Sequence, residues 1–123
     1  MISDYFQNVE KKISKTSVVA EKAIDFREFD INEGFVMGKI LFIDGSALEF
    51  LEYLKDDIRL KYRFHYMNEK GALIFRYDNA PHHQVTTFPD HKHTSEGVIA
   101  SVPQELSSVV DEIERLISAR GWA

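Results

Sequence analysis

The strongest constraint on the fold is a stretch of alternating side chains at residues 58–79. Two runs, IRLKYRFHYM and ALIFRYDN, lie on either side of the turn sequence NEKG. Alternation of apolar and polar residues is typical of strands with one buried and one exposed face. A short turn that contains Gly joins neighbouring antiparallel strands. The stretch therefore predicts a β-hairpin within an antiparallel sheet.

A hairpin that turns at Glu69-Lys70 divides its side chains between two faces, because side chains alternate along a strand. Tyr62 then lies opposite Tyr77, and Phe64 lies opposite Phe75. The face that we expect to form the core, under helices, carries Tyr62, Phe64, Tyr66, Leu73, Phe75 and Tyr77. The other face receives Lys61, Arg63, His65, Ile74, Arg76 and Asp78.

In this register Arg63 and Arg76 are direct cross-strand neighbours. Like charges that face each other destabilise a sheet, so this pair brings no advantage for folding. Two adjacent guanidinium groups do form a binding site for a phosphate or a carboxylate. The alternative is that both arginines reach solvent, or pair with Asp78 and a C-terminal glutamate. The nearby His65 favours the anion site.

The segments before the hairpin predict one helix and several strands. A helix is expected at residues 3–14, with Ser3 as its cap and Phe6, Val9 and Ile13 along one side. The β-rich runs SVVAEKAIDFREFD and FVMGKILFI follow, and the turn DGS joins the second run to ALEFLEYLK. ALEFLEYLK fits a strand or a helix, and we favour a strand because the turn pairs it with its neighbour.

After the hairpin the pattern becomes a long polar loop through Pro89, and a helix is predicted from Pro103 to Gly121. The apolar side of that helix carries Leu106, Val109, Val110, Ile113, Leu116 and Ile117. We therefore expect a single α+β domain over residues 1–123. Its antiparallel meander sheet has about five strands, with an N-terminal and a C-terminal helix.

Charge is distributed unevenly along the chain. Residues 59–93 contain six Lys and Arg against three Asp and Glu, whereas the net charge of the whole chain is -5. A basic segment on an acidic body indicates a localised anion site. The chain has no cysteine, no apolar run of about 18 residues and no signal-peptide pattern. These features favour a cytoplasmic protein that does not enter a membrane.

All five histidines lie between His65 and His93, and four of them lie in PHHQVTTFPDHKH. One interpretation is a divalent metal site in which His91 and His93 point the same way and His82 or His83 completes the set, with Asp78 or Asp90. A second is acid–base catalysis on a phosphodiester, since histidine titrates near neutral pH. A third is structural, with the histidines attaching a loop to the sheet.

The sequences YRFHY, LIFRYDNAPHH and TFPDHKH resemble the TumE-type family, small prokaryotic toxins of toxin–antitoxin pairs. The resemblance covers roughly residues 35–101 and departs from the family pattern at Gln84 and Asp90, where proline and histidine are expected. It implies a cognate antitoxin, a small DNA-binding protein. The family's motif positions in this sequence are His65, Arg76, Tyr77, Asp78, Asn79, His82, His83, His91, Lys92 and His93.

The preferred hypothesis is a toxin that acts as a metal-independent endoribonuclease and needs no cofactor. Its candidate catalytic residues are His65, Arg76, His82, His83, His91 and His93. Its candidate substrate-binding residues are Arg63, Asp78, Asn79 and Lys92. If a divalent metal is used, its expected ligands are His82, His91 and His93. RNA is the expected substrate, and a homodimer the expected assembly.

The alternative is a non-catalytic interaction protein whose histidine-rich loop binds a metal ion or the antitoxin. A third possibility, nucleotidyl or phosphate transfer to tRNA, requires an added metal. It ranks last because no pair of carboxylates appears at a suitable spacing.

Overall fold

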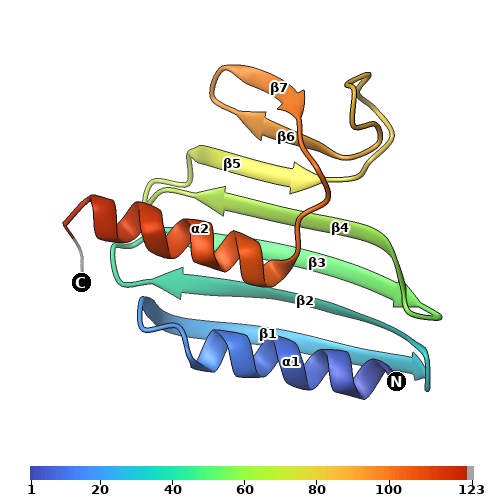
Figure 1. The fold of residues 1–123 in the computed structure, drawn as a ribbon. Coiled ribbons are helices and arrows are strands. Elements are labelled where there is room, and N and C mark those ends of the chain that lie inside the picture. The colour runs from blue at the N-terminus through green and yellow to red at the C-terminus, as the bar shows by residue number, and fades with distance from the viewer. Residues whose placement is uncertain (122–123) are drawn as a thin grey trace.

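The computed structural model describes residues 1–121, which form one antiparallel sheet and two helices (Figure 1). The elements are α1 (Ile2–Ser14), β1 (Val19–Asp30), β2 (Glu33–Phe42), β3 (Ala47–Lys55), β4 (Ile58–Met67), β5 (Leu73–Asp78), β6 (His91–Thr94), β7 (Gly97–Ala100) and α2 (Leu106–Ala119). The strands pair in chain order from β1 to β7. Both helices cover the same face, so the opposite face carries no helix formed by residues 1–121 (Figure 1). The predicted α+β meander with terminal helices is confirmed.

Within residues 1–121 the sheet has seven strands, so the prediction of about five was too low. The ambiguous segment 47–55 is a strand, as predicted. The additional hairpin is β6–β7, which follows the long loop. Each of its strands has only four residues, and β6 has the sequence HKHT. So short a polar strand lacks the apolar alternation from which strands are recognised.

The pairing of β4 with β5 differs from the predicted register by two residues. Arg63 lies opposite Asp78 and His65 lies opposite Arg76, so Arg63 and Arg76 are not direct neighbours. The turn is longer than predicted, because the Asn68 side chain accepts hydrogen bonds from the amides of Lys70 and Ala72. The pairing also shifts after Tyr66, where β5 contributes an extra residue.

A shift of two residues leaves most side chains on their predicted faces, because side chains alternate with a period of two. The expected aromatic core is confirmed at Tyr62, Phe64, Tyr66, Phe75 and Tyr77, all of which are buried. The irregular pairing changes the start of β5. Ile74, predicted on the outer face, packs against the core instead.

The helices complete the core with small differences from their predicted limits. Helix α1 begins at Ile2 with Met1 at its cap position, so Ser3 lies inside the first turn. Helix α2 begins at Leu106 instead of Pro103, and the Glu105 amide donates to the Ser108 hydroxyl at its start. Its predicted apolar side is buried, except for the partly exposed Leu116. Neither helix in the described part of the chain is long and apolar enough to cross a membrane.

Gly34 allows α1 to lie close to the sheet, and its replacement by alanine is expected to destabilise the fold. A Cβ atom there would lie 2.5 Å from the Arg27 carbonyl oxygen and 3.0 Å from the side chains of Ile2 and Phe6. We expect Gly34→Ala to lower the free energy of unfolding by about 1–3 kcal/mol, the usual cost of overpacking. Urea unfolding followed by circular dichroism measures this loss.

Asn8→Ala on the exposed side of α1 is the control, and is expected to change stability by less than about 0.5 kcal/mol. Equal stability of the Gly34→Ala variant and the wild-type protein would contradict this close approach.

Candidate functional site

The helix-free face of the sheet carries two rows of functional side chains across β3 to β6. In one row the register aligns Glu49, His65, Arg76 and His93. In the next row it aligns Leu51, Arg63, Asp78 and His91. The rows lie two residues apart along each strand, a distance of about 6.6 Å, so they form one continuous patch. We call its charged and imidazole members the His/Arg face: Arg63, His65, Arg76, Asp78, His91 and His93.

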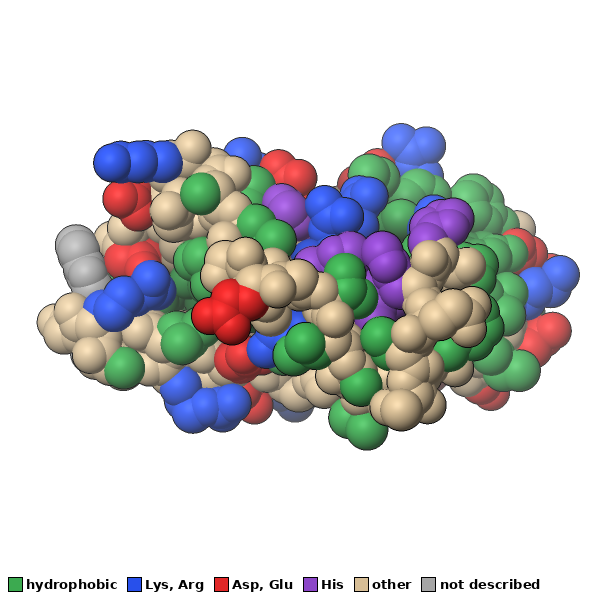
Figure 2. All heavy atoms as spheres, turned by 90° about the horizontal axis from the view of Figure 1, so that it is seen from above, with side chains coloured by type: hydrophobic (Ala, Val, Ile, Leu, Met, Phe, Trp, Pro, Cys, Tyr) green, Lys and Arg blue, Asp and Glu red, His purple; other side chains and the backbone are tan. Residues whose placement is uncertain are grey.

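Figure 2, viewed from the β6–β7 side of the sheet, shows histidine side chains gathered beside Lys and Arg side chains. The sequence predicted that Arg63, His65, Arg76 and Asp78 share a face, and the structure confirms this. His91 and His93 join them because β6 pairs with β5.

His65 and Arg76 are linked directly. The Arg76 Nε–H donates to His65 Nδ1 at 3.1 Å, so His65 uses Nδ1 as an acceptor. Partial burial, and then the positive charge of Arg76, lower the pKa of His65. This imidazole is therefore held in its neutral form, with Nδ1 accepting from the guanidinium group and Nε2 carrying the hydrogen.

Asp78, His91 and His93 form a second, more buried group. Asp78 is only 6% exposed and His91 only 1% exposed. His91 Nε2 lies 2.9 Å from Asp78 Oδ1, and His93 Nε2 lies 3.5 Å from Asp78 Oδ2. Burial lowers the pKa of the partly buried His93, although the Asp78 carboxylate partly opposes this. The Asp78 carboxylate thus contacts both imidazoles.

His83 approaches this group from the loop between β5 and β6. Its ring centre lies 4.9 Å from that of His91 and 5.1 Å from that of His93. One nitrogen from each of the three rings lies within 4.8 Å of the others. The structure therefore brings His83, rather than the predicted His82, to the position of a third imidazole ligand.

Four candidate residues lie away from the His/Arg face or take other roles. His82 is exposed. Asn79 accepts from the Tyr62 amide and donates to the Leu60 carbonyl, so it holds β4 beside the start of the loop. Lys92 points to the helix side, where Nζ lies 3.3 Å from Glu112 Oε2. Asp90, named above as a possible carboxylate of the metal site, accepts a hydrogen bond from the Tyr62 hydroxyl.

Two features could not be recognised from the sequence. Glu49 lies opposite His65 on the helix-free face, and only the pairing of β3 with β4 could have revealed it.

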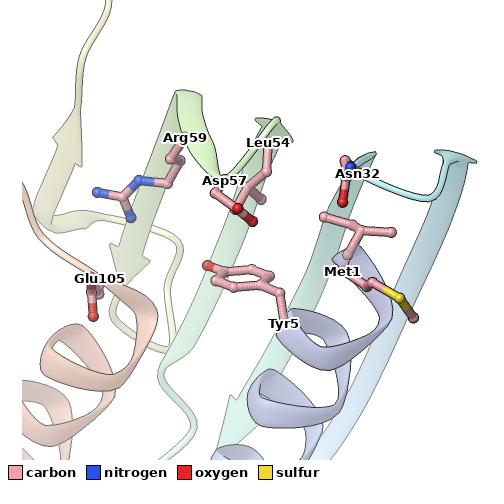
Figure 3. Close-up of a pocket in the computed structure, with 8 residues that line it drawn as sticks. Met1, Tyr5, Asn32, Leu54, Asp57, Arg59 and Glu105 are labelled. Carbon is pink, nitrogen blue, oxygen red and sulfur yellow. The ribbon is translucent and has the colours of Figure 1, made fainter.

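On the helix side, the fully buried Glu52 forms an ion pair with Arg59 at 2.9 Å. Figure 3 shows Tyr5 and Arg59 at the adjacent pocket of about 300 Å³, which α1, the start of α2 and the β3–β4 turn enclose. This pocket lies on the face opposite to the imidazoles.

Comparison with known protein families gives a match over most of the chain. The model of a protein family described as Toxin TumE matches residues 9–120, nearly the whole chain. No curated protein and no solved structure matches the chain.

Proposed function

The chain belongs to the TumE toxin family, and we propose that it acts as a metal-independent endoribonuclease at its His/Arg face. Membership in a toxin family implies a cognate antitoxin as partner. We propose further that the antitoxin binds DNA, that the toxin acts on RNA in the cytoplasm, and that it forms a homodimer.

The observation that carries the activity is the alignment of His65, Arg76 and His93 across three adjacent strands. Because strands are spaced by about 4.8 Å, the two imidazoles start from backbone positions roughly 10 Å apart with a guanidinium between them. A phosphodiester bound at Arg76 would thus have one imidazole on either side. This is the arrangement that general acid–base cleavage of RNA requires.

In the proposed reaction Arg76 binds the scissile phosphate, and Arg63 contributes positive charge from the neighbouring row. One imidazole accepts the proton of the ribose 2'-hydroxyl as its oxygen attacks phosphorus. The other donates a proton to the 5'-oxygen as the P–O5' bond breaks. The products are a 2',3'-cyclic phosphate and a 5'-hydroxyl, and the guanidinium groups stabilise the negative charge that develops on the phosphoryl oxygens. Asp78 positions His93 through its carboxylate.

His65→Gln and His93→Gln are each expected to slow cleavage by roughly 10²–10⁴-fold, the usual contribution of general acid–base catalysis. The wild-type rate is expected to be the same with and without EDTA. His82→Gln is the matched control, because this histidine is exposed and lies outside the site. Gel analysis of defined RNA substrates measures the cleavage rates of the three variants and of the wild-type protein with and without EDTA.

Loss of cleavage in EDTA would contradict a metal-independent reaction. Failure of the wild-type protein to cleave any RNA would contradict the nuclease proposal itself.

A second candidate function is a non-catalytic interaction protein whose histidine loop binds the antitoxin or a metal ion. The approach of His83 to His91 and His93 favours it, since this contact orders the loop. Replacing His93, which is more exposed than the buried His91, with Gln separates the two candidates. If the protein is a nuclease, the variant loses toxicity and keeps the wild-type melting temperature. If the histidine loop has a structural role, the melting temperature of the variant falls.

A further inference from the structure

We propose that His83, His91, His93 and Asp78 bind one divalent transition-metal ion of the zinc class, and that this ion inhibits the toxin. The metal site depends only on the geometry of these four side chains. Its inhibitory effect rests on the proposed function, because the ion occupies the imidazole of His93.

The three imidazoles lie close to one another, and Asp78 contacts two of them. His91 Nε2 lies 3.0 Å from His93 Nε2 and 2.9 Å from Asp78 Oδ1. The Asp78 carboxylate also lies 3.5 Å from His93, and one nitrogen of His83 lies within 4.8 Å of a nitrogen of each of the other two imidazoles. In a tetrahedral site with Zn–N bonds of about 2.0–2.1 Å, ligand atoms are separated by about 3.4 Å. A small movement of the His83 loop completes that geometry.

The hydrogen bond of His91 indicates which of its nitrogens is free to bind a cation. Nδ1 lies 2.8 Å from the Pro89 carbonyl oxygen, which can only accept, so Nδ1 carries a hydrogen. In the neutral ring, Nε2 then presents a lone pair to a carboxylate oxygen and to a second imidazole nitrogen. These groups repel one another unless a proton or a metal cation lies between them. Metal-binding histidines usually donate their other N–H to a backbone carbonyl in this way.

The types of ligand select the class of metal. Three imidazole nitrogens and one carboxylate oxygen form a set that suits zinc and neighbouring transition metals, whereas magnesium and calcium prefer oxygen ligands alone. His91 and Asp78 are almost fully buried, so two of the four ligands are held in place before the metal arrives.

Inhibition follows from the use of His93 in both processes. A metal ion bound to Nε2 of His93 occupies the lone pair that would accept a proton in catalysis. His65 and Arg76 lie outside the metal site and remain free, so RNA can still bind. The metal-bound protein is therefore expected to bind RNA without cleaving it.

The binding arm of the test uses the whole protein without RNA. Isothermal titration with Zn²⁺, and absorption spectra with Co²⁺, are expected to show one ion per chain, with the visible bands of tetrahedral cobalt. His83→Gln is expected to weaken binding at least tenfold, while His82→Gln retains it. His83 belongs to a loop, so circular dichroism should show both variants folded. Equal Co²⁺ affinity in the wild-type protein and the His83→Gln variant would overturn the site.

The activity arm measures RNA cleavage in EDTA and then with increasing Zn²⁺. Cleavage is expected to fall by half near the Kd for Zn²⁺ and to return when EDTA is added. The His83→Gln variant should require at least tenfold more Zn²⁺. Faster cleavage with Zn²⁺ would overturn inhibition. If no RNA is cleaved under any condition, the proposed nuclease and its inhibition both fail, while the titration still decides whether the metal site exists.

Discussion

Replacing Arg76 with alanine is expected to slow RNA cleavage by roughly 10²–10³-fold and to leave the protein folded. Arg76 is the central member of the row that also contains His65 and His93. Loss of one group that stabilises developing negative charge usually costs this factor. The change also removes the hydrogen bond to His65 Nδ1, so this imidazole loses its orientation as well. Single-turnover cleavage of a short RNA measures the effect.

Two further variants test whether the loss of cleavage is specific to the guanidinium group of Arg76. Arg76→Lys keeps the positive charge but loses the planar fork of donors, so partial activity is expected. Arg27→Ala removes an exposed arginine from distant β1 and should cleave at the wild-type rate. Equal rates for Arg76→Ala, Arg27→Ala and the wild-type protein would show that the row does not bind the reacting phosphate.

Replacing Arg59 with alanine is expected to lower the free energy of unfolding by about 3–5 kcal/mol. Glu52 is fully buried, and its Oε2 pairs with Arg59 Nη1 at 2.9 Å. Its other oxygen, Oε1, has no hydrogen-bond partner within residues 1–121. Without Arg59 the carboxylate would be an unpaired charge in the core, which is among the most destabilising changes known. Chemical unfolding measures the loss.

The double variant Arg59→Met with Glu52→Gln tests the cause, because it removes both charges and should recover most of the lost stability. Arg27→Ala again provides the control, since Arg27 and Asp25 form an exposed ion pair that should contribute less than about 1 kcal/mol. If Arg59→Ala were no more destabilising than Arg27→Ala, the ion pair between Glu52 and Arg59 would not contribute to the stability of the core.

Much of the fold was predictable from the sequence because its elements carry strong local patterns. The aromatic residues of β4 and β5 alternate with polar ones, and this pattern correctly predicted Tyr62, Phe64 and Tyr77 as core residues. The hairpin β6–β7 was missed because HKHT has no apolar alternation. Its formation depends on pairing with β5, which is a contact between distant parts of the chain.

The candidate site was predictable in its composition but not in its arrangement. The sequence indicated that arginines and histidines would meet on one side of the hairpin. It did not distinguish His83 from His82, because adjacent loop residues differ only in how the loop folds. It also did not exclude Lys92, whose position between His91 and His93 in β6 sends its side chain to the helix face.

The sequence by itself determined which side chains of β4 and β5 share a face, because the pleat of a strand sets that alternation locally. Tertiary structure alone decided which of them are neighbours. The turn at Asn68 and the irregular pairing after Tyr66 shifted the register by two residues, which preserved both faces but placed His65, instead of Arg63, opposite Arg76. Strand pairing, unlike alternation, depends on how the chain closes its turns and loops, and no local pattern contains that information.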